Sequence, residues 1–332
     1  MIHSGTDPAA IAEAARLIRS GELIGLPTET VYGLGADASN DAAVALIFAA
    51  KGRPSNHPLI VHIAEARQVL DYASSVPPFA ARLIAAFWPG TLTLILPRKP
   101  GVATAAAGGQ DSIGLRCPSH PVAQALLKAC RTGVAGPSAN RFGRVSPTTA
   151  AHVADELGDD LFVLDGGPCE VGIESTIVDC TRGHPVLLRP GVLTRAQLEA
   201  ACGEPVLDKE ALTSNAPRAS GTLASHYAPH AKVRLMNKAE LQAALAALQN
   251  NTTDAAPIAV YAYSISDIRQ ISTASVLYRT MPLQASQVAH ELFAVLRDFD
   301  AQGVAQIWVE ALPANSEWEG VRDRLTRAAT PL

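Results

Sequence analysis

The stretch from Ile24 to Gly35, IGLPTETVYGLG, constrains the fold more than any other part of the chain. It begins as an apolar strand, and Pro27 then fixes one backbone angle. Gly33 and Gly35 permit turns that a side chain would block, so the sequence predicts a glycine-rich turn after the strand. Polar and aromatic side chains lie between: Thr28, Glu29, Thr30 and Tyr32. Two interpretations explain the stretch equally well. It is either one wall of a small-molecule site or an ordinary strand followed by a turn.

The chain has 332 residues, which is long enough for two domains. Strands and helices alternate irregularly over 1–203, which predicts an α/β domain with a twisted mixed sheet and helices packed on it. Residues 204–231 show no sustained period and are interpreted as a linker, which is too long to be idle inside a compact protein. The regular pattern returns over 232–332, which predicts a smaller, Rossmann-like α/β domain.

Composition excludes several classes of protein. Hydrophobic residues make up 48% and charged residues 17%, and the net charge is −4. A negative net charge argues against a protein that binds nucleic acid by electrostatic attraction alone. The five cysteines are scattered without a C-x-x-C pair, as in a reducing compartment. We find no signal-peptide pattern and no apolar run of membrane-spanning length, so a cytoplasmic protein that does not contact membranes is expected.

The segment 51–59, KGRPSNHPL, is a candidate phosphate site. Lys51 and Arg53 are two cations on a turn stiffened by prolines, which suits a triphosphate because each charge-assisted bond contributes ~1.5–3 kcal/mol. The preference of cations for helix C-termini explains Lys51 alone but not the whole cluster. His62, in the apolar strand that follows, is on its own more typical of a hydrogen-bonded core histidine than of a catalyst.

Three further stretches carry candidate ligands. Arg116 ends an apolar strand, so it is expected to be part-buried and to need an anion, either an internal Asp or Glu or a substrate carboxylate. The turn at 136–146 is rich in donors, although ordinary turn chemistry also explains it. Ser175 and Arg189 stand at strand ends. No Walker A, Rossmann glycine, zinc or G-x-S-x-G pattern occurs, so the residues alone indicate a polyanion and carboxylate site without a P-loop.

Taken together and in order, these motifs resemble a known family. PTETVYGLG, KGRPSNHPLIVHI, WPGTLTLIL, GLRCPSHP, GPSANRFGRVSPT, GIESTIVD and LLRPG are similar to the YrdC-like domain of threonylcarbamoyl-AMP synthases over about residues 8–200. HYAP at 226–229 and the extra domain resemble the long form of that family. The resemblance implies a nucleotidyltransferase that makes threonylcarbamoyl-AMP and pyrophosphate from L-threonine, bicarbonate or CO2, and ATP. The product would pass to a transferase complex that modifies tRNA to threonylcarbamoyladenosine.

The resemblance also implies site residues. Five positions would bind threonine: Thr30, His62, Arg116, Gly136 and Ser175. Nine would bind ATP: Lys51, Arg53, His57, Ser112, Ser138, Ser146, Arg189, His226 and Tyr227. Lys51, Arg53 and His62 are the candidate catalytic residues, with His62 the only reasonable general base. The resemblance implies Mg2+ carried on the ATP phosphates, no metal bound by protein ligands alone and no organic prosthetic group.

One departure and two rival functions qualify this prediction. The resemblance makes the linker a lid over the active site, and its motif departs from the family pattern. Relatives often carry Pro-Gly-Met and a basic residue just before His-Tyr, whereas this chain has Ser220-Gly221-Thr222 and Ser225 before His226, so a linker cation at that place is not expected. An RNA-binding module is the first rival. The net charge of −4 and its even split between the two halves of the chain argue against it, and direct tRNA contact is expected to be weak. A carbamoyl-transfer domain of the kind found in hydrogenase maturation proteins is the second, but its accompanying segments are absent from the sequence.

Overall fold

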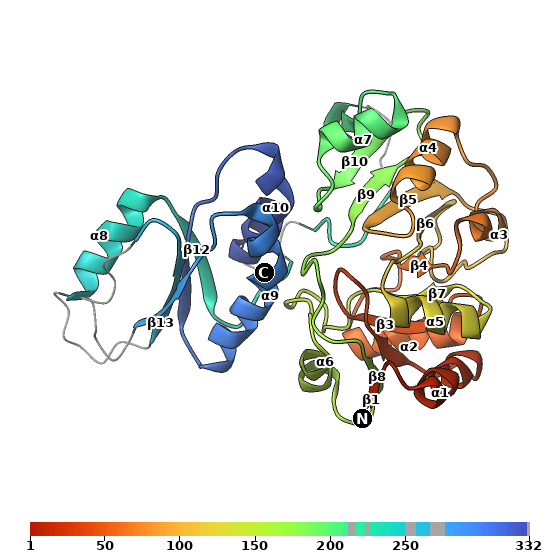
Figure 1. Ribbon diagram of the computed structural model, residues 1–332, viewed down its shortest axis with the longest axis horizontal. Helices are drawn as coiled ribbons and strands as arrows, with labels where there is room; N and C mark the ends of the chain where they lie inside the picture. The colour runs from red at the N-terminus through yellow and green to blue at the C-terminus, as the bar shows by residue number, and fades with distance from the viewer. Residues whose placement is uncertain (212–216, 224–225, 250–256, 266–275, 331–332) are drawn as a thin grey trace. The chain divides into compact units, whose positions relative to one another are not determined.

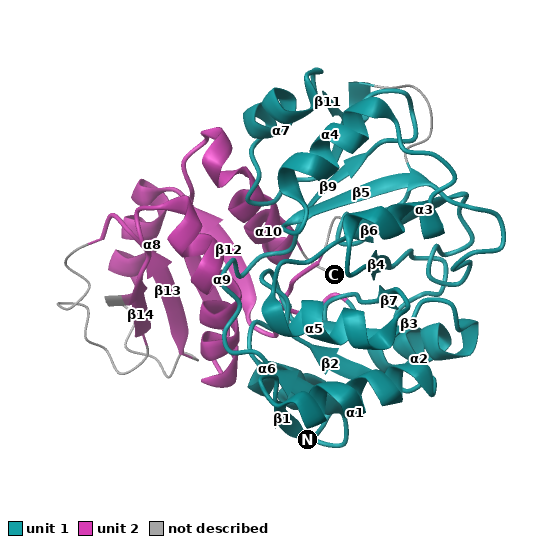
Figure 2. Cartoon of the chain, turned by 45° about the vertical axis from the view of Figure 1, so that its right-hand side comes forward, with its two compact units in different colours: residues 1–142, 146–222 teal, residues 143–145, 223–332 magenta. Residues whose placement is uncertain are grey.

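The computed structural model describes residues 1–211, 217–223, 226–249, 257–265 and 276–330. Residues 212–216 and 224–225 of the predicted linker therefore lie outside the described part, as do 250–256, 266–275 and 331–332 of the predicted C-terminal domain. The chain divides into two compact units (Figure 2). Unit 1 comprises 1–142 and 146–222, and unit 2 comprises 143–145 and 223–332. The division near 222 falls inside the segment predicted as a linker.

Unit 1 is built on one mixed sheet of eleven strands in the order β1-β8-β2-β3-β7-β4-β6-β5-β9-β10-β11 (Figure 1). Parallel and antiparallel pairs both occur, since β4 pairs with β6 in parallel and β5 pairs with β6 in antiparallel. This confirms the predicted twisted mixed sheet. The strands are β1 (Ile2–Ser4), β2 (Ile24–Leu26), β3 (Gly33–Asp37), β4 (Ile60–His62), β5 (Leu92–Pro97), β6 (Ser112–Arg116), β7 (Val134–Ala135), β8 (Phe162–Asp165), β9 (Thr176–Asp179), β10 (Val186–Arg189) and β11 (Leu207–Asp208).

Helices cover this sheet and begin where the sequence provides caps. Asp7 caps α1 through the backbone of Ala9, and Asn40 caps α2, which ends at Gly52 in the left-handed region. α1 packs against α5, and α4 packs against α7 (Figure 1). The helices are α1 (Pro8–Arg19), α2 (Asp41–Lys51), α3 (Val69–Tyr72) after a short 3-10 turn (Ala66–Gln68), α4 (Pro78–Phe87), α5 (Pro121–Cys130), α6 (Ala150–Leu157) and α7 (Arg195–Cys202); a second 3-10 turn is Lys209–Ala211.

The predicted glycine-rich turn at Gly33 and Gly35 is wrong. Both glycines lie in β3, which pairs with β2 in antiparallel and places Ile24 opposite Gly35. The reason for glycine is close packing, because a Cβ on Gly35 would lie 2.9 Å from Leu26 Cδ2 and 3.0 Å from Val134 Cγ1. The turn itself is the preceding segment, 27–32, which connects β2 to β3.

Unit 2 contains a parallel four-stranded sheet in the order β12-β15-β13-β14, which confirms a second, smaller α/β domain. Residues Gly143–Val145 belong to this unit, where Arg144 pairs with Asp300 at 3.0 Å. No helix in the described residues is long and apolar enough to cross a membrane. The elements are β12 (Lys232–Met236), α8 (Lys238–Gln249), β13 (Ile258–Ala262), β14 (Val276–Thr280), α9 (Ala285–Ala301), β15 (Gln306–Glu310), a 3-10 turn (Ser316–Trp318) and α10 (Glu319–Ala329).

Candidate active site

The candidate site of unit 1 lies across one face of its sheet. Successive side chains of a strand point to opposite faces, so Ser112, Gly114 and Arg116 of β6 share a face. The register places Ile60 beside Gly114 and His62 beside Arg116. On the other side of β6, Ile95 lies opposite Gly114. The face therefore carries an apolar middle, with Ser112 at one end and Arg116 and His62 at the other.

The turn between β2 and β3 supplies one wall. Thr28 organises it: its Oγ1 accepts the backbone N–H groups of Thr30 and Val31, each at 3.2 Å, and donates to the Val31 carbonyl at 2.6 Å. The hydroxyls of Thr28 and Thr30 are 2.9 Å apart. Thr28, Glu29 and Thr30 are all buried. The hydroxyl of Thr30 is thus fixed by its own turn, at the end of the site where Arg116 lies.

Arg116 is buried and bonds to three separate segments. Its Nη1 donates to Thr30 Oγ1 at 2.7 Å, its Nη2 to Glu29 Oε1 at 2.6 Å, and its Nε to the Gly90 carbonyl at 3.1 Å. Of the two anions that the sequence left open for this arginine, the structure supplies the internal one, Glu29. Burial pushes the pKa of Glu29 up, but the charge and hydrogen bond of Arg116 outweigh it, so the pKa is lowered overall.

His62 lies beside Arg116 on β4 and is buried. Burial lowers the pKa of its imidazole to about 3, and the neighbouring Arg116 adds to the effect. A Cβ on Gly136 would lie 2.8 Å from the ring, so glycine at that position makes room for the histidine. The imidazole is neutral at pH 7 and is too weak a base to remove a proton efficiently, because an efficient general base has a pKa near the working pH.

Ser175 and Arg189 meet at the start of β9. Arg189 donates to the Ser175 carbonyl from Nε at 3.1 Å and from Nη2 at 2.9 Å, and Nη2 also reaches Ser175 Oγ at 3.2 Å. Ser175 Oγ is 2.8 Å from the hydroxyl of Thr93, a buried residue that the sequence did not single out. Alternation along β5 could have indicated it, since Thr93 shares a face with Ile95.

Lys51, predicted to contact the ATP phosphates, bonds to the protein backbone in this structure, and its contact with phosphates stays a prediction. Its ammonium is buried and donates to the backbone carbonyls of Ser138 and Asn140. Burial and the nearby Arg53 hold its pKa well below the usual value. Its bonds therefore shape the loop that carries Ser138. Asn140, also buried there, was not among the predicted residues.

Arg53, His57 and the linker residue Ser220 gather at another part of the site. Arg53 Nη2 donates to the Pro58 carbonyl at 2.8 Å and to Ser220 Oγ at 3.0 Å. Arg189 Nη1 donates to the Ser220 carbonyl at 3.0 Å. Burial, with Arg53 and Arg218 nearby, lowers the pKa of His57. Two of the arginines predicted to bind ATP thus both bond to Ser220.

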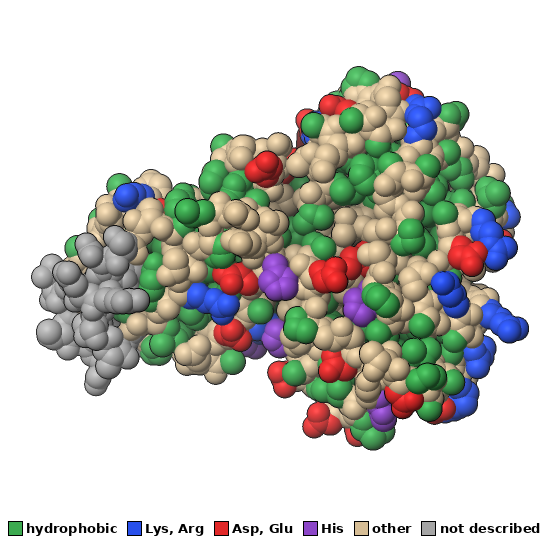
Figure 3. All heavy atoms as spheres, in the orientation of Figure 1, with side chains coloured by type: hydrophobic (Ala, Val, Ile, Leu, Met, Phe, Trp, Pro, Cys, Tyr) green, Lys and Arg blue, Asp and Glu red, His purple; other side chains and the backbone are tan. Residues whose placement is uncertain are grey.

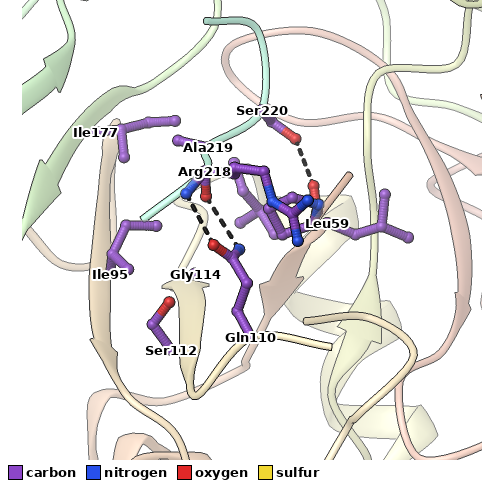
Figure 4. A pocket seen from close by; sticks show the side chains of 11 residues that line it. Leu59, Ile95, Gln110, Ser112, Gly114, Ile177, Arg218, Ala219 and Ser220 are labelled. Atoms are coloured by element: carbon purple, nitrogen blue, oxygen red, sulfur yellow. Dashed lines mark hydrogen bonds between the residues drawn. The ribbon is translucent and has the colours of Figure 1, made fainter. Parts of the chain in front are cut away.

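A pocket on the apolar middle of the face lies beneath the same linker segment (Figure 4). Its wall includes Ser112 and Gly114, and the backbone of Arg218 covers it: Arg218 N donates to Gln110 Oε1 at 2.8 Å, and Gln110 Nε2 donates to the Arg218 carbonyl at 3.3 Å. A carboxamide bound in this two-bond way has the donor and acceptor pattern that an adenine edge also presents. The other lining residues are Pro58, Leu59, Ile60, Ile95, Ile177, Ala219 and Ser220.

Ser146 is buried and donates to Glu174, a buried carboxylate that the sequence analysis did not assign. The negative charge of Glu174 acts to raise the pKa of Lys51, against the larger lowering by burial. The described residues contain no group of three or more His, Cys, Asp or Glu side chains that could hold a metal ion. Glu174 is therefore suited to contribute at most one carboxylate to a metal whose other ligands come from a bound phosphate and water.

His226 and Tyr227, predicted to contact the nucleotide, belong to unit 2. Tyr227 is buried with a φ of 64°, stacks on Phe293 with ring centroids 5.4 Å apart, and lies 5.3 Å from the guanidinium of Arg324. Its N–H donates to His226 Nδ1 at 3.0 Å. Within unit 2 the pair is therefore tightly packed, and the predicted nucleotide contact stays a prediction.

Two family profiles match nearly the whole chain. One is described as "Telomere recombination" and matches residues 16–191, and the other is described as "Threonylcarbamoyl-AMP synthase, C-terminal domain" and matches residues 193–330. The chain belongs to the threonylcarbamoyl-AMP synthase family. Among its relatives, the threonylcarbamoyl-AMP synthase of Bacillus subtilis is 38% identical over 98% of this chain and 94% of its own length, and that of Pyrococcus abyssi is 36% identical over 95% and 93%.

Solved structures of this family have the same architecture. Sua5 of P. abyssi complexed with L-threonine matches with a TM-score of 0.85 at 35% identity, over 96% of this chain and 94% of that one. A variant of the same Sua5 matches with a TM-score of 0.86 at 33% identity, over 99% and 96%. Both likenesses extend over both units.

Proposed function

We propose that the protein is an L-threonylcarbamoyladenylate synthase, a nucleotidyltransferase that converts L-threonine, bicarbonate and ATP into threonylcarbamoyl-AMP and pyrophosphate. The observation that carries this proposal is the buried guanidinium of Arg116 at the end of a polar sheet face, in a chain of this family. A guanidinium is the group best suited to fork a carboxylate. The relative solved with L-threonine supports an amino acid as its ligand.

The amino acid end of the site is assigned to the residues around Arg116. Arg116 would take the threonine carboxylate, and Thr30 and the neutral His62 would hydrogen-bond the rest of the molecule. Ser175 and the backbone of Gly136 complete this set. Neutral His62 brings no second positive charge, so the charge of Arg116 selects the carboxylate end of the substrate.

The nucleotide end is assigned to the rest of the face. Ser112 and the apolar pocket would hold the nucleoside, and phosphates would replace Ser220 on Arg53 and Arg189. Lys51 would act by holding the loop of Ser138. Mg2+ would bind mainly to the ATP phosphates, with Glu174 as a candidate protein ligand. It would neutralise the charge of the leaving pyrophosphate. The remaining assigned contacts are His57, Ser146, His226 and Tyr227.

The proposed reaction requires little covalent chemistry from the protein itself. The threonine amine adds to the carbon of CO2, which bicarbonate supplies by losing hydroxide, and gives a carbamate. A carbamate oxygen then attacks the α-phosphorus of ATP, and the bond to the β-phosphate oxygen breaks to release pyrophosphate. Holding these groups in line and neutralising charge with Arg53 and Arg189 accounts for catalysis. The amine proton leaves to solvent or to the hydroxide from bicarbonate, because the pKa of His62 is too low for its imidazole to accept that proton.

Pyrophosphate release tests the proposal. Release from ATP should require both L-threonine and bicarbonate, and the nucleotide product should carry the threonylcarbamoyl group by mass spectrometry. Arg116→Ala should raise the threonine requirement far more than the ATP requirement. Release without threonine, or tight RNA binding without turnover, would refute the function, whereas equal effects of Arg116→Ala on both substrates would refute only the assignment of Arg116.

The product is a mixed carbamic–phosphoric anhydride, so it is a reactive acyl donor that needs an acceptor close by. We place the reaction in the cytoplasm and expect a separate transferase complex to use this donor on tRNA. Direct tRNA contact by this chain is expected to be weak, because its net charge is −4.

A further inference from the structure

Glu29 forms a buried ion pair with Arg116 in the middle of the amino acid end of the site. Their closest atoms are 2.6 Å apart, and each side chain is 4% exposed. A buried ion pair adds little net stability relative to well-packed apolar residues, because both charges lose their hydration. The pair therefore calls for an explanation beyond stability.

Glu29 is itself held from three directions. Its Oε2 accepts the N–H of Ser119 at 3.2 Å, and its backbone carbonyl accepts the N–H of Val171 at 2.8 Å. The turn organised by Thr28 fixes the next residue. The backbone of Glu29 and one of its carboxylate oxygens are therefore held by groups other than Arg116.

The bonds of Arg116 leave a defined set of donors. Thr30, Glu29 and Gly90 take one N–H each from Nη1, Nη2 and Nε. A guanidinium has five N–H groups. Within the described part of the chain, one N–H on each terminal nitrogen therefore has no acceptor. A carboxylate can accept one N–H from each terminal nitrogen of a guanidinium when those two N–H groups point the same way.

We propose that Glu29 is a positioning residue that holds the guanidinium of Arg116 so that its two remaining terminal N–H groups face the α-carboxylate of the amino acid substrate. Glu29 does not touch the substrate in this arrangement. The inference rests on the proposed function, which makes threonine the ligand of Arg116. The opposite arrangement, in which Glu29 is a place-holder that the substrate carboxylate displaces, predicts the opposite sign for the experiment below.

The test compares Glu29→Gln, Glu29→Asp and wild type in the full-length chain. Steady-state pyrophosphate release gives KM for threonine and for ATP, and titration calorimetry with threonine gives an affinity independent of turnover. Glu29→Gln keeps an acceptor of the same size but loses the charge, so threonine KM and Kd should rise about tenfold, with ATP KM within twofold. Glu29→Asp keeps the charge one methylene further away, and its effect should be smaller.

Two controls isolate positioning from general damage. Asp179 forms a similar buried pair with Arg182 at 2.6 Å in the same unit, so Asp179→Asn removes an equivalent carboxylate away from the assigned residues. Its threonine KM should stay within twofold of wild type. In an Arg116→Lys background, which has no fork to position, Glu29→Gln should change threonine KM by less than twofold, because Glu29 acts only through Arg116.

The outcomes separate the inference from the function on which it rests. A wild-type chain that neither binds threonine nor releases pyrophosphate with it would overturn the proposed function. A working wild type whose threonine KM is unchanged or lowered in Glu29→Gln would overturn the role of Glu29 alone. Additive effects of the Glu29 and Arg116 substitutions would do the same.

Discussion

His62 shows how one buried side chain links pH to stability. Its pKa in the folded chain is about 3, below the ordinary value of 6.5, chiefly because burial disfavours the charged imidazole. The unfolded chain therefore binds more protons between these two values. It follows that this residue's contribution to stability is complete above about pH 6.5 and is progressively lost as the pH falls toward 3.

Replacing His62 should flatten that dependence. Between pH 7.5 and 5, wild type should lose about 2 kcal/mol of unfolding free energy through this residue, and His62→Gln should not. The difference in unfolding free energy is measured by urea unfolding at the two pH values, with hydrogen exchange of β4 peptides as the readout. His184→Gln, at an exposed position, is the matched control. An identical pH response in His62→Gln and wild type would contradict the prediction.

Among single residues, the sequence indicated the chemistry of Arg116 but not its partner. An arginine after an apolar strand must find an anion, and that need is local information. The partner, Glu29, is 87 residues away in the chain, so only the pairing of strands brings the two together. The alternation of Ser112, Gly114 and Arg116 was available in the sequence and would have placed all three on one face.

Secondary-structure elements were predictable where hydrophobic pattern decides and not where packing does. β4 and β6 are mostly apolar and coincide with the apolar strands expected at His62 and before Arg116. β3, with the sequence GLGAD, has little intrinsic preference for a strand, and its neighbours β2 and β7 impose the conformation. β1 has only three residues, and its partner β8 lies near residue 163. α6 begins at Ala150 because Thr149 supplies the cap.

The packing explanation for β3 can be tested by adding one methyl group. Gly35→Ala would place a Cβ within 3.0 Å of Leu26 and Val134 side-chain atoms, so it should lower the unfolding free energy by about 1–3 kcal/mol. Gly33→Ala meets its nearest atom at 3.2 Å and should cost less. Adding Val134→Ala should recover part of the loss in a double-mutant cycle measured by urea unfolding. Strictly additive losses would show that crowding is not the reason.

On the proposed function, the linker segment around Ser220 would compete with the ATP phosphates for Arg53 and Arg189. Ser220 bonds through its hydroxyl to Arg53 and through its carbonyl to Arg189, and the hydroxyl also donates to the Pro58 carbonyl at 3.0 Å. Ser220→Ala removes the hydroxyl contact to Arg53, worth about 1 kcal/mol, so ATP KM should fall about fivefold. Thr222→Ala removes only a local bond to the Ala219 carbonyl and is the control. A raised ATP KM in Ser220→Ala would mean that the segment helps to hold the nucleotide.

At the scale of the whole chain, charge and core organisation point to small-molecule chemistry. The net charge is −4, and on the face drawn in Figure 3 acidic and basic side chains are interspersed among apolar ones. The net charge argues against binding of a nucleic-acid backbone by electrostatics alone. Each unit has a hydrophobic cluster of its own, one around Leu94 and Leu115 in unit 1 and one around Val260 and Leu245 in unit 2.

All five cysteines lie in unit 1 and are buried, so their reactivity reports on the opening of that unit. Burial raises the pKa of Cys130 to about 12 and also raises that of Cys117, Cys169 and Cys180. Since the thiolate is the reactive form, labelling of the folded chain should be slow and limited by unfolding. On the proposed function, threonine and ATP bind the folded chain and not the unfolded one, so ligand at 100 times Kd should slow labelling about 100-fold. Ellman's reagent measures the rate; a cysteine that reacts at once in the native chain, or a rate unaffected by either substrate, would contradict this account.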